Sequence, residues 1–367
     1  MTEPCVALLG RRDEPTDGVE EYCRYLAMAL APRGFALELV RVPWNELGWR
    51  AALKQLEEQS RNWRGRRVFL QYTALAWSRR GFPLAVLRVL KLLQKNGVRC
   101  SIVFHDAGPY TGQRLIDRVR RSIQLHVMRK ALRLAKLAVL TIPAEKISWL
   151  PASGHRSVFI PVGANLPAPE TAWTGKKEES GVPPAVAIFS VTGGSYEQTE
   201  VGHIVAAARH AAERAGAFRL VVFGRNAEHA GPMIQEGLRG TSVEVIVRGL
   251  LSAEEIVRQL GACAVSLFLR GGISTRRGSA IAGIACGLPV IACEDAETGG
   301  PILEAGLVLL PPGAYNEFGP ALARVLTDAT YRAELSARSR KAQELYFSWQ
   351  AIAARYAEVM EKSQSDR

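Results

Sequence analysis

The sequence predicts an α/β protein made of two doubly wound, Rossmann-like domains that face a cleft. Short apolar runs alternate along the chain with longer amphipathic segments, which is the pattern of parallel β-α-β units. This alternation occurs twice, before and after a stretch rich in proline, glycine and charge. A chain of 367 residues is also longer than most single domains. We therefore expect a first domain over 1–165, a linker over 166–184 and a second domain over 185–342.

Composition narrows the classes of partner. A formal net charge of +12 favours anionic partners, among them nucleic acid, nucleotide-linked substrates and an anionic membrane face. Nucleic acid is disfavoured, because the basic residues are not interleaved with aromatic ones and no recognised motif occurs. The six cysteines form no C-x-x-C pair and no cluster with histidine, so we expect reduced thiols and no zinc site. We also expect no cofactor and no required metal.

Apolar runs also bear on localisation. None is long enough for a transmembrane helix. The N-terminus has no basic residues before its first apolar run, which favours a first strand over a signal peptide. We therefore expect a cytoplasmic protein, with peripheral attachment to the inner face of the cell membrane as a further possibility.

The first domain is expected to begin with a β-α-β unit. Its strands are predicted at 6–9, 35–42, 68–72, 100–104, 139–142 and 158–161, and its helices at 20–33, 46–60, 83–95 and 113–136. The loop 10–18, with Gly18 at its tip, lacks the G-x-G-x-x-G fingerprint of dinucleotide binding. Acidic Asp17, Glu20 and Glu21 open the following helix. They fit an ordinary turn with helix-dipole carboxylates better than a phosphate site, which they weaken.

His105 and Asp106 directly follow the predicted strand 100–104. Ligands of open α/β sheets bind outside the carboxyl ends of the strands, so this pair is placed for substrate contact or proton transfer. The alternative is a capping aspartate beside a structural histidine.

The helix predicted over 113–136 is strongly basic. It carries Arg114, Arg118, Arg120, Arg121, Arg129, Lys130, Arg133 and Lys136 against the single acid Asp117. Its other face is expected to hold Leu115, Ile116, Val119, Ile123, Val127, Leu132 and Leu134. Such a basic amphipathic helix is typical of contact with an anionic membrane surface, here through 114–136. The alternative is a solvated basic face on an otherwise buried helix.

The second domain repeats the alternation. Its elements are expected at 185–190, 199–215, 220–223, 243–247, 253–260, 263–269, 279–286 and 289–292. Between the last two strands the chain breaks at glycines 271–272 and offers Ser274, Thr275, Arg276 and Arg277 before the helix 279–286. A glycine-loosened loop that feeds a helix N-terminus presents N–H groups and a positive dipole end. We therefore predict an anion pocket here; the alternative is a solvated arginine pair on an ordinary turn.

Four motifs, in this order, resemble the GT-B glycosyltransferases, in particular the large retaining family 4. The segment from Asp17-Gly18-Val-Glu-Glu resembles the family's "GGVE" start, and Ile160-Pro-Val-Gly163 its "IPNGV". Gly287-Leu-Pro-Val-Ile-Ala292 resembles its "GxPVIA", and Ser348 to Tyr356 its terminal helix. The resemblance covers nearly the whole chain. It implies a GT-B fold whose last segment, 343–367, crosses back to the first domain.

The chain departs from that pattern at the donor site. Aligned on Gly287, the two carboxylates of the family's E-x7-E motif are replaced by Ser274 and Ala282. Gly193 and Gly194 stand where the diphosphate-gripping segment begins, without a clear basic pair. From their chemistry we instead expect the diphosphate to be held by Gly193, Gly194, Arg225, Ser274, Thr275, Arg276 and Arg277.

The resemblance also implies roles for other positions. Nucleobase contacts are expected at Arg248, Gly249 and Leu250. Contacts to the sugar or the acceptor are expected at His105 and Asp106. Further sugar contacts are expected at Gly18, Glu294 and Asp295, although Glu294 and Asp295 are as typical of a surface turn.

The expected function is metal-independent transfer, with retention, of a sugar from a nucleotide-sugar donor to a glycan or lipid-linked acceptor in polysaccharide or glycoconjugate biosynthesis. The alternatives are an inactive GT-B partner subunit, which the missing carboxylates favour, and a nucleotide-sugar epimerase on the same fold.

Overall fold

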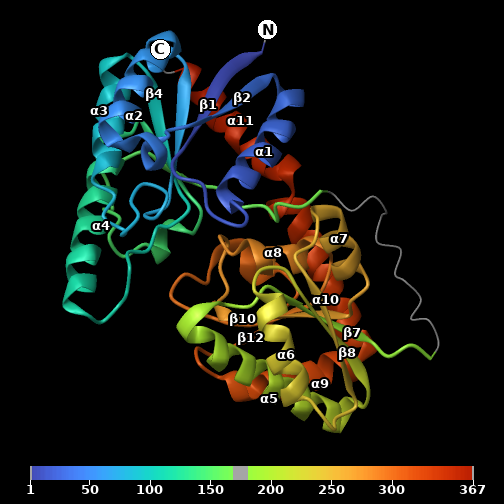
Figure 1. Ribbon diagram of the computed structural model, residues 1–367. Coiled ribbons are helices and arrows are strands. Elements are labelled where there is room, and N and C mark those ends of the chain that lie inside the picture. The colour runs from blue at the N-terminus through green and yellow to red at the C-terminus, as the bar shows by residue number, and fades with distance from the viewer. Residues whose placement is uncertain (1, 168–180, 366–367) are drawn as a thin grey trace. The chain divides into compact units, whose positions relative to one another are not determined.

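The computed structural model describes residues 2–167 and 181–365, so most of the predicted linker lies outside the described residues. Two compact units divide the chain (Figure 1). Unit 1 comprises Met1–Val162 and Trp349–Arg367, and unit 2 comprises Gly163–Ser348. Each unit holds a six-stranded sheet in which every pair of neighbouring strands is parallel. The predicted α/β class with two Rossmann-like halves is confirmed.

Unit 1 is a three-layer arrangement in which helices cover both faces of the sheet (Figure 1). The strand order is β2-β1-β3-β4-β5-β6. The strands are β1 Glu3–Leu9, β2 Phe35–Arg41, β3 Arg67–Tyr72, β4 Arg99–Phe104, β5 Leu137–Leu140 and β6 Ser157–Phe159. The helices are α1 Gly18–Leu30, α2 Trp44–Ser60, α3 Ala85–Lys95, α4 Leu115–Leu134 and α11 Trp349–Ser365. Central strands such as β3 are buried along their length, which explains why they read as continuous apolar runs.

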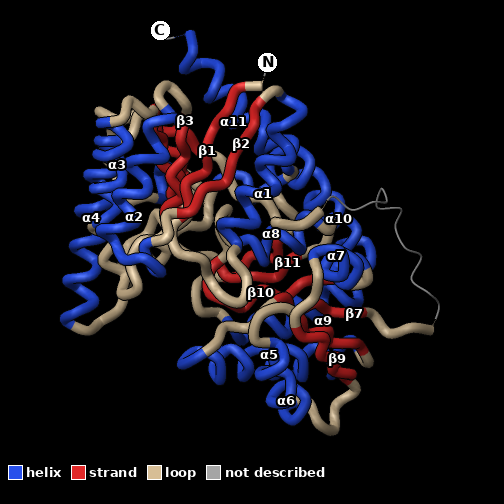
Figure 2. The backbone as a smooth tube through the Cα atoms, turned by 45° about the horizontal axis from the view of Figure 1, so that its top comes forward, coloured by secondary structure: helices blue, strands red, loops and turns tan. Residues whose placement is uncertain are grey.

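Unit 2 has the strand order β12-β11-β10-β7-β8-β9. Helices flank its strands as they do in unit 1 (Figure 2). The strands are β7 Ala185–Phe189, β8 Phe218–Phe223, β9 Val243–Gly249, β10 Val265–Gly272, β11 Val290–Cys293 and β12 Leu307–Leu310. The helices are α5 Glu197–Ala215, α6 Ala227–Gly237, α7 Ala253–Gly261, α8 Gly278–Ala285, α9 Phe318–Thr327 and α10 Ala329–Ala342.

The terminal helix belongs to unit 1. It begins at Trp349 rather than at 343, because residues 343–347 form a π-helical turn and Ser348 is extended. Within unit 1, the Tyr22 hydroxyl donates to that of Tyr356 at 3.0 Å, and the Arg67 Nη2 donates to the Met360 carbonyl at 2.9 Å. These buried polar contacts hold α11 against α1 and the sheet.

Helix α4 differs from its predicted faces. Its buried residues are Asp117, Gln124, Val127, Met128, Ala131 and Leu132. The first turns therefore bury polar side chains, and Leu115, Ile116 and Val119 are exposed, so the alternative of an otherwise buried helix does not hold for this end of α4. Among the residues that the structure describes, no helix is both long and apolar enough to span a bilayer.

Each sheet has one point at which the strand order reverses. In unit 1 it lies between β1 and β3, and in unit 2 between β7 and β10. Ligands of doubly wound sheets bind outside the carboxyl ends of the strands at this point. In unit 1 the position is closed by a loop, because the Arg11 amide donates to the Ala76 carbonyl at 2.7 Å and a Cβ at Gly10 would lie 2.3 Å from that oxygen.

Candidate functional site

A β-bulge shapes the reversal point of unit 2. Phe268 of β10 pairs with Ala292 of β11, and the next pair is Gly272 with Cys293, so three residues of β10 stand opposite no partner there. Gly271, at a φ of 78°, allows this excursion. Bulges redirect side chains next to functional sites. Here Arg270 lies in the bulge, at the end of the strand beside β7.

The N-terminus of α8 lies at the end of the loop 273–277. The Ala280 and Ile281 amides both donate to the Arg277 carbonyl at 3.0 Å, and no side chain caps the helix. The first amides of an uncapped helix, together with its dipole, favour an anion. This end of α8 therefore provides backbone donors next to the bulge.

Three arginines, Arg225, Arg270 and Arg277, gather positive charge at this edge. In the described part of the chain, the buried Nε atoms of Arg270 and Arg277 have no hydrogen-bond partner. Burial lowers the pKa of Arg270; Glu200 opposes the shift and Arg225 adds to it. Burial likewise lowers the pKa of Arg277, with Arg276 and Arg270 contributing. The cationic forms are thus crowded and poorly solvated, a condition that a bound anion would relieve.

Arg276 is engaged elsewhere. Its Nε lies 2.6 Å from Oε2 of Glu297 and its Nη2 lies 3.0 Å from Oε1. The sequence predicts the same role for Arg276 and Arg277, whereas in the structure the two side chains have different contacts. Ser274 and Thr275, also predicted as anion contacts, are fully buried. They lie within the loop rather than at its surface, because the loop packs onto the turn after β11.

That turn contains Glu294 and Asp295. The Glu294 amide donates to the Leu310 carbonyl and so extends the hydrogen bonding between β11 and β12. The Glu294 side chain is exposed. The Asp295 Oδ1 accepts the Glu297 amide at 2.8 Å, and a Cβ on Gly272 would lie 2.2 Å from the Asp295 Cβ. Asp295 therefore shapes the turn that carries Glu297, and Glu294 is the more accessible of the two acids.

The loop after β7 carries Gly193 and Gly194. Gly194 has a φ of 73° and open space where a Cβ would stand. The following helix α5 places Glu200 so that Oε2 accepts the Thr192 amide at 2.9 Å. Glu197 Oε1 accepts the Asn226 Nδ2 at 2.7 Å. These acids fix the glycine loop and keep negative charge at the start of α5, so the cationic side of the site is the β10–α8 side.

Arg248 and Gly249 end the edge strand β9, and Leu250 follows it. Strand β8 separates β9 from the reversal point. Gly249 has a φ of 65°, and its carbonyl accepts the Gly224 amide at 2.6 Å. The Leu250 side chain is 55% exposed, which leaves an apolar surface at this end of the sheet.

His105, Asp106 and Gly18 belong to unit 1. The His105 side chain is only 9% exposed, its Nε2 lies 2.8 Å from the Gln71 Oε1, and its ring meets Tyr22 edge-on at 5.0 Å. Asp106, the next residue, is half-buried. Gly18 is exposed at the start of α1, where Asp17 caps the helix by accepting the Val19 and Glu20 amides at 3.1 Å. Asp17 thus acts as the ordinary helix-dipole carboxylate expected from the sequence.

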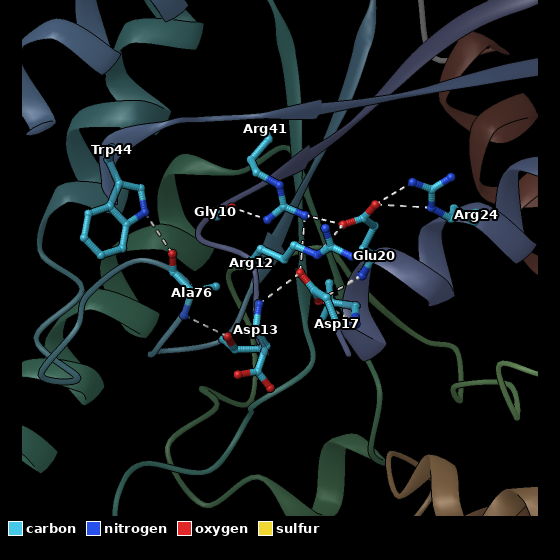
Figure 3. Close-up of polar contacts among 11 residues, drawn as sticks. Gly10, Arg12, Asp13, Asp17, Glu20, Arg24, Arg41, Trp44 and Ala76 are labelled. Carbon is cyan, nitrogen blue, oxygen red and sulfur yellow. Dashed lines mark hydrogen bonds and ion pairs between the residues drawn. The ribbon is translucent and has the colours of Figure 1, made fainter. Parts of the chain in front are cut away.

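The close-up in Figure 3 shows a second polar cluster in unit 1, around Arg41 of β2. Its guanidinium donates to Gly10 O at 2.6 Å, to Glu20 Oε2 at 2.6 Å and to Asp17 Oδ2 at 3.3 Å. A pocket of about 480 Å³ beside it is lined by Leu9, Glu20, Arg24, Ala27, Met28, Leu39 and Arg41. Because carboxylates already engage both Arg24 and Arg41, this cluster is less suited to an anion than the site in unit 2.

No protein-family model and no curated protein matches the sequence. Solved structures match over nearly the whole chain. Anabaena HepE in complex with UDP and glucose has a TM-score of 0.66 at 14% identity, covering 98% of this chain and 100% of that one. A glycosyltransferase from Rickettsia africae has a TM-score of 0.65 at 13% identity, covering 98% of both chains. A putative UDP-N-acetylglucosamine 2-epimerase from Listeria monocytogenes has a TM-score of 0.62 at 11% identity, covering 100% of this chain and 98% of that one. These likenesses establish the GT-B fold.

Proposed function

We propose that this chain is a glycosyltransferase that moves a sugar from a nucleotide-sugar donor to a glycan or lipid-linked acceptor, with retention and without a metal. One observation carries the proposal: Arg270 and Arg277, whose buried Nε atoms have no hydrogen-bond partner among the described residues, flank an uncapped helix N-terminus at the reversal point of the unit 2 sheet. Structures of the same fold contain UDP or UDP-glucose, which supports a nucleotide diphosphate as the anion.

The chemistry of transfer explains why such a site is useful. Negative charge develops on the diphosphate as the bond to the sugar breaks. Fixed N–H groups and cations that meet this charge lower the barrier, and one such donor typically contributes about 2.7–4 kcal/mol. An arginine fork can bind two phosphate oxygens at once. We assign this role to Arg270, Arg277 and the first amides of α8, with Arg225 beside them.

The remaining predicted contacts complete the proposal. The nucleobase is assigned to the end of β9, at Arg248, Gly249 and Leu250, and the diphosphate also approaches Gly193 and Gly194. Glu294 is the more accessible candidate for a sugar contact on the turn after β11. His105 and Asp106 are assigned to the sugar or acceptor from unit 1, together with Gly18.

The proposals for the acceptor and for the cellular location rest on the positive charge of the protein. A chain with a formal net charge of +12 and a basic helix over 114–136 fits an anionic membrane face, which would present a lipid-linked acceptor. We therefore propose a cytoplasmic protein, peripheral on the inner membrane face, in polysaccharide or glycoconjugate biosynthesis.

A thermal-shift panel of UDP, GDP, ADP and dTDP tests the donor site. Binding to the folded state raises the melting temperature, and a ligand at 100 times its dissociation constant stabilises by about 2.7 kcal/mol. A shift with at least one diphosphate that disappears in Arg270→Gln/Arg277→Gln supports the proposal. A flat response across the panel contradicts it and favours an inactive partner subunit.

A second assay separates transfer from epimerisation, the activity named for the Listeria structure. Incubation with the nucleotide sugar that binds should release free nucleoside diphosphate when acceptor is supplied. Conversion of the intact nucleotide sugar to an epimer, without acceptor, would replace the transferase proposal with the epimerase alternative.

A further inference from the structure

The first two turns of α4 form an exposed patch that combines large apolar side chains with arginines. Leu115, Ile116 and Val119 are 78%, 50% and 51% exposed, although such side chains are usually buried. Arg114, Arg118 and Arg121 surround them and are also exposed. We call these six residues the α4 tip.

The charges of the tip are not neutralised within the described residues. No acidic side chain there forms an ion pair with Arg114, Arg118 or Arg121. The nearby acid Asp117 is buried, and its Oδ1 accepts Arg120 Nη1 at 2.6 Å while its Oδ2 accepts the Arg114 amide at 3.1 Å. Asp117 thus stabilises the start of the helix, and the exposed face is left with cations and apolar groups only.

The geometry of unit 1 makes the tip prominent. Because α4 follows β4 in a β-α-β unit, it begins at the carboxyl edge of the sheet. Figures 1 and 2 both show its first turns extending past the other elements of unit 1, at the lower left. The loop 106–114 connects the tip to His105 at the end of β4, so tip and predicted acceptor residues lie along the same edge of the sheet.

From this arrangement we propose that the α4 tip inserts its apolar side chains into an anionic lipid bilayer. Arginines bind the headgroups, while Leu115, Ile116 and Val119 enter the boundary with the acyl chains. The inference extends the proposed membrane contact of 114–136 and rests on it. Only one end of the helix inserts, where the carboxyl edge of unit 1 faces the bilayer. The alternative is that the whole basic face of the helix adheres to the bilayer surface.

Flotation of the full-length protein with vesicles tests insertion. Wild type should float with phosphatidylcholine vesicles that contain phosphatidylglycerol, and not with pure phosphatidylcholine. Two triple variants remove one component each: Leu115→Ser/Ile116→Ser/Val119→Ser and Arg114→Gln/Arg118→Gln/Arg121→Gln. Each should lower the partition coefficient at least about tenfold, because both the apolar and the charged component are needed for stable binding.

Two control variants carry the same kinds of substitution at exposed positions outside the α4 tip. Leu47→Ser/Leu303→Ser/Leu345→Ser removes three apolar side chains, and Arg50→Gln/Arg61→Gln/Arg214→Gln removes three charges. Both controls should float nearly as well as wild type. Equal loss in the charge control would mean that diffuse charge, not the tip, binds the vesicles.

The remaining outcomes contradict the inference at distinct levels. Full flotation of the serine variant would exclude insertion and leave surface adhesion by the basic helix. Failure of wild type to float would overturn the membrane contact itself. Concentration-dependent dimers in light scattering that the serine variant abolishes, without flotation, would assign the tip to a protein interface. Nucleotide-induced thermal shifts should be unchanged in every tip variant, so the donor site is judged independently.

Discussion

Arg276 and Glu297 form a two-point ion pair, with 2.6 Å between Nε and Oε2 and 3.0 Å between Nη2 and Oε1. Such planar pairs combine two charge-assisted hydrogen bonds with a fixed geometry. The pair ties the loop before α8 to the turn after β11. Consecutive arginines therefore differ in their contacts: Arg276 holds the loop in place, whereas the Nε of Arg277 has no hydrogen-bond partner among the described residues, and Arg277 is the one that we propose for the ligand.

This difference between Arg276 and Arg277 predicts that substitutions at the two positions affect ligand affinity and stability differently. Arg277→Gln and Arg270→Gln should each weaken binding of the nucleoside diphosphate by about 1.5–3 kcal/mol, the usual contribution of a hydrogen bond to a charged group. Melting temperature should change little or rise, because each substitution removes a crowded cation. Isothermal titration calorimetry measures the affinity, and differential scanning calorimetry the stability.

Arg276→Gln and Glu297→Gln are the matched controls. Arg276→Gln leaves the half-buried Glu297 carboxylate without its cation and should lower the melting temperature more than either ligand-site variant does. Glu297→Gln should destabilise as well, yet bind the diphosphate at least as tightly as wild type, because a negative charge next to the site is removed. Loss of affinity only in the Arg276 and Glu297 variants would reverse the assignment.

The roles of His105 and Asp106 can be distinguished by comparing the stability and the turnover of two variants. His105 is buried, hydrogen-bonded to Gln71 and packed on the Tyr22 ring, so His105→Ala should lower stability by about 1–3 kcal/mol. Asp106 is half-buried, and Asp106→Asn should reduce turnover with little change in melting temperature. Unfolding by urea and turnover with a saturating donor measure the two effects.

The conservative variant His105→Gln refines this test, because it keeps a polar group that can reach Gln71. Near-wild-type turnover after stability is restored would assign His105 to packing. A loss of turnover larger than that of Asp106→Asn, at normal stability, would assign it to the chemistry.

The buried hydroxyl pair of Tyr22 and Tyr356 anchors the terminal helix. Burial raises the pKa of both phenols, so each hydroxyl stays protonated and available as a donor. Tyr356→Phe removes one partner and leaves the other unsatisfied, which should cost about 1–3 kcal/mol of unfolding free energy. Tyr346→Phe is the control, since that hydroxyl bonds Glu304 at an exposed position. An equal effect of the two substitutions would mean that the buried pair does not fasten α11.

Much of the fold follows from the alternation of apolar and amphipathic segments. The predicted strands 68–72 and 100–104 are observed with one added residue each, because buried parallel strands are apolar along their length. The sequence does not predict helix α6, because Gly231, Pro232 and Gly237 interrupt its helical pattern. Tertiary contacts supply what its local propensity does not, as Ala230 and Ile234 are fully buried.

The site was only partly predictable. The sequence does predict the loop before α8, because glycine, hydroxyl and arginine residues precede a helix there. The sequence does not point to Arg270, because this residue stands one position past an expected strand end and nothing in the sequence indicates the bulge. The sequence predicts Arg276 as a ligand contact from its place in the loop, and its pairing with Glu297 is hidden because that partner lies 21 residues away in the chain. Pairing over that distance depends on how β10 and β11 are joined, which local patterns do not reveal.

Glu20 gives a pH-dependent prediction for unit 1. Its Oε1 accepts Arg24 Nη2 and its Oε2 accepts Arg41 Nη2, each at 2.6 Å, and the Arg24 hydrogen bond is the main cause that lowers its pKa from 4.5. A lowered folded-state pKa means that the stabilisation is complete above 4.5 and is lost as the pH falls through the lower folded-state value. Glu20→Gln should thus melt below wild type at pH 7, by the small amount of about 0.2–1 kcal/mol that such solvent-screened pairs contribute, and this gap should be smaller at pH 3. Glu213→Gln, on the exposed side of α5, serves as the control and should differ little from wild type at both values. A gap that persists undiminished at pH 3 would show that Glu20 stabilises through packing rather than through its charge.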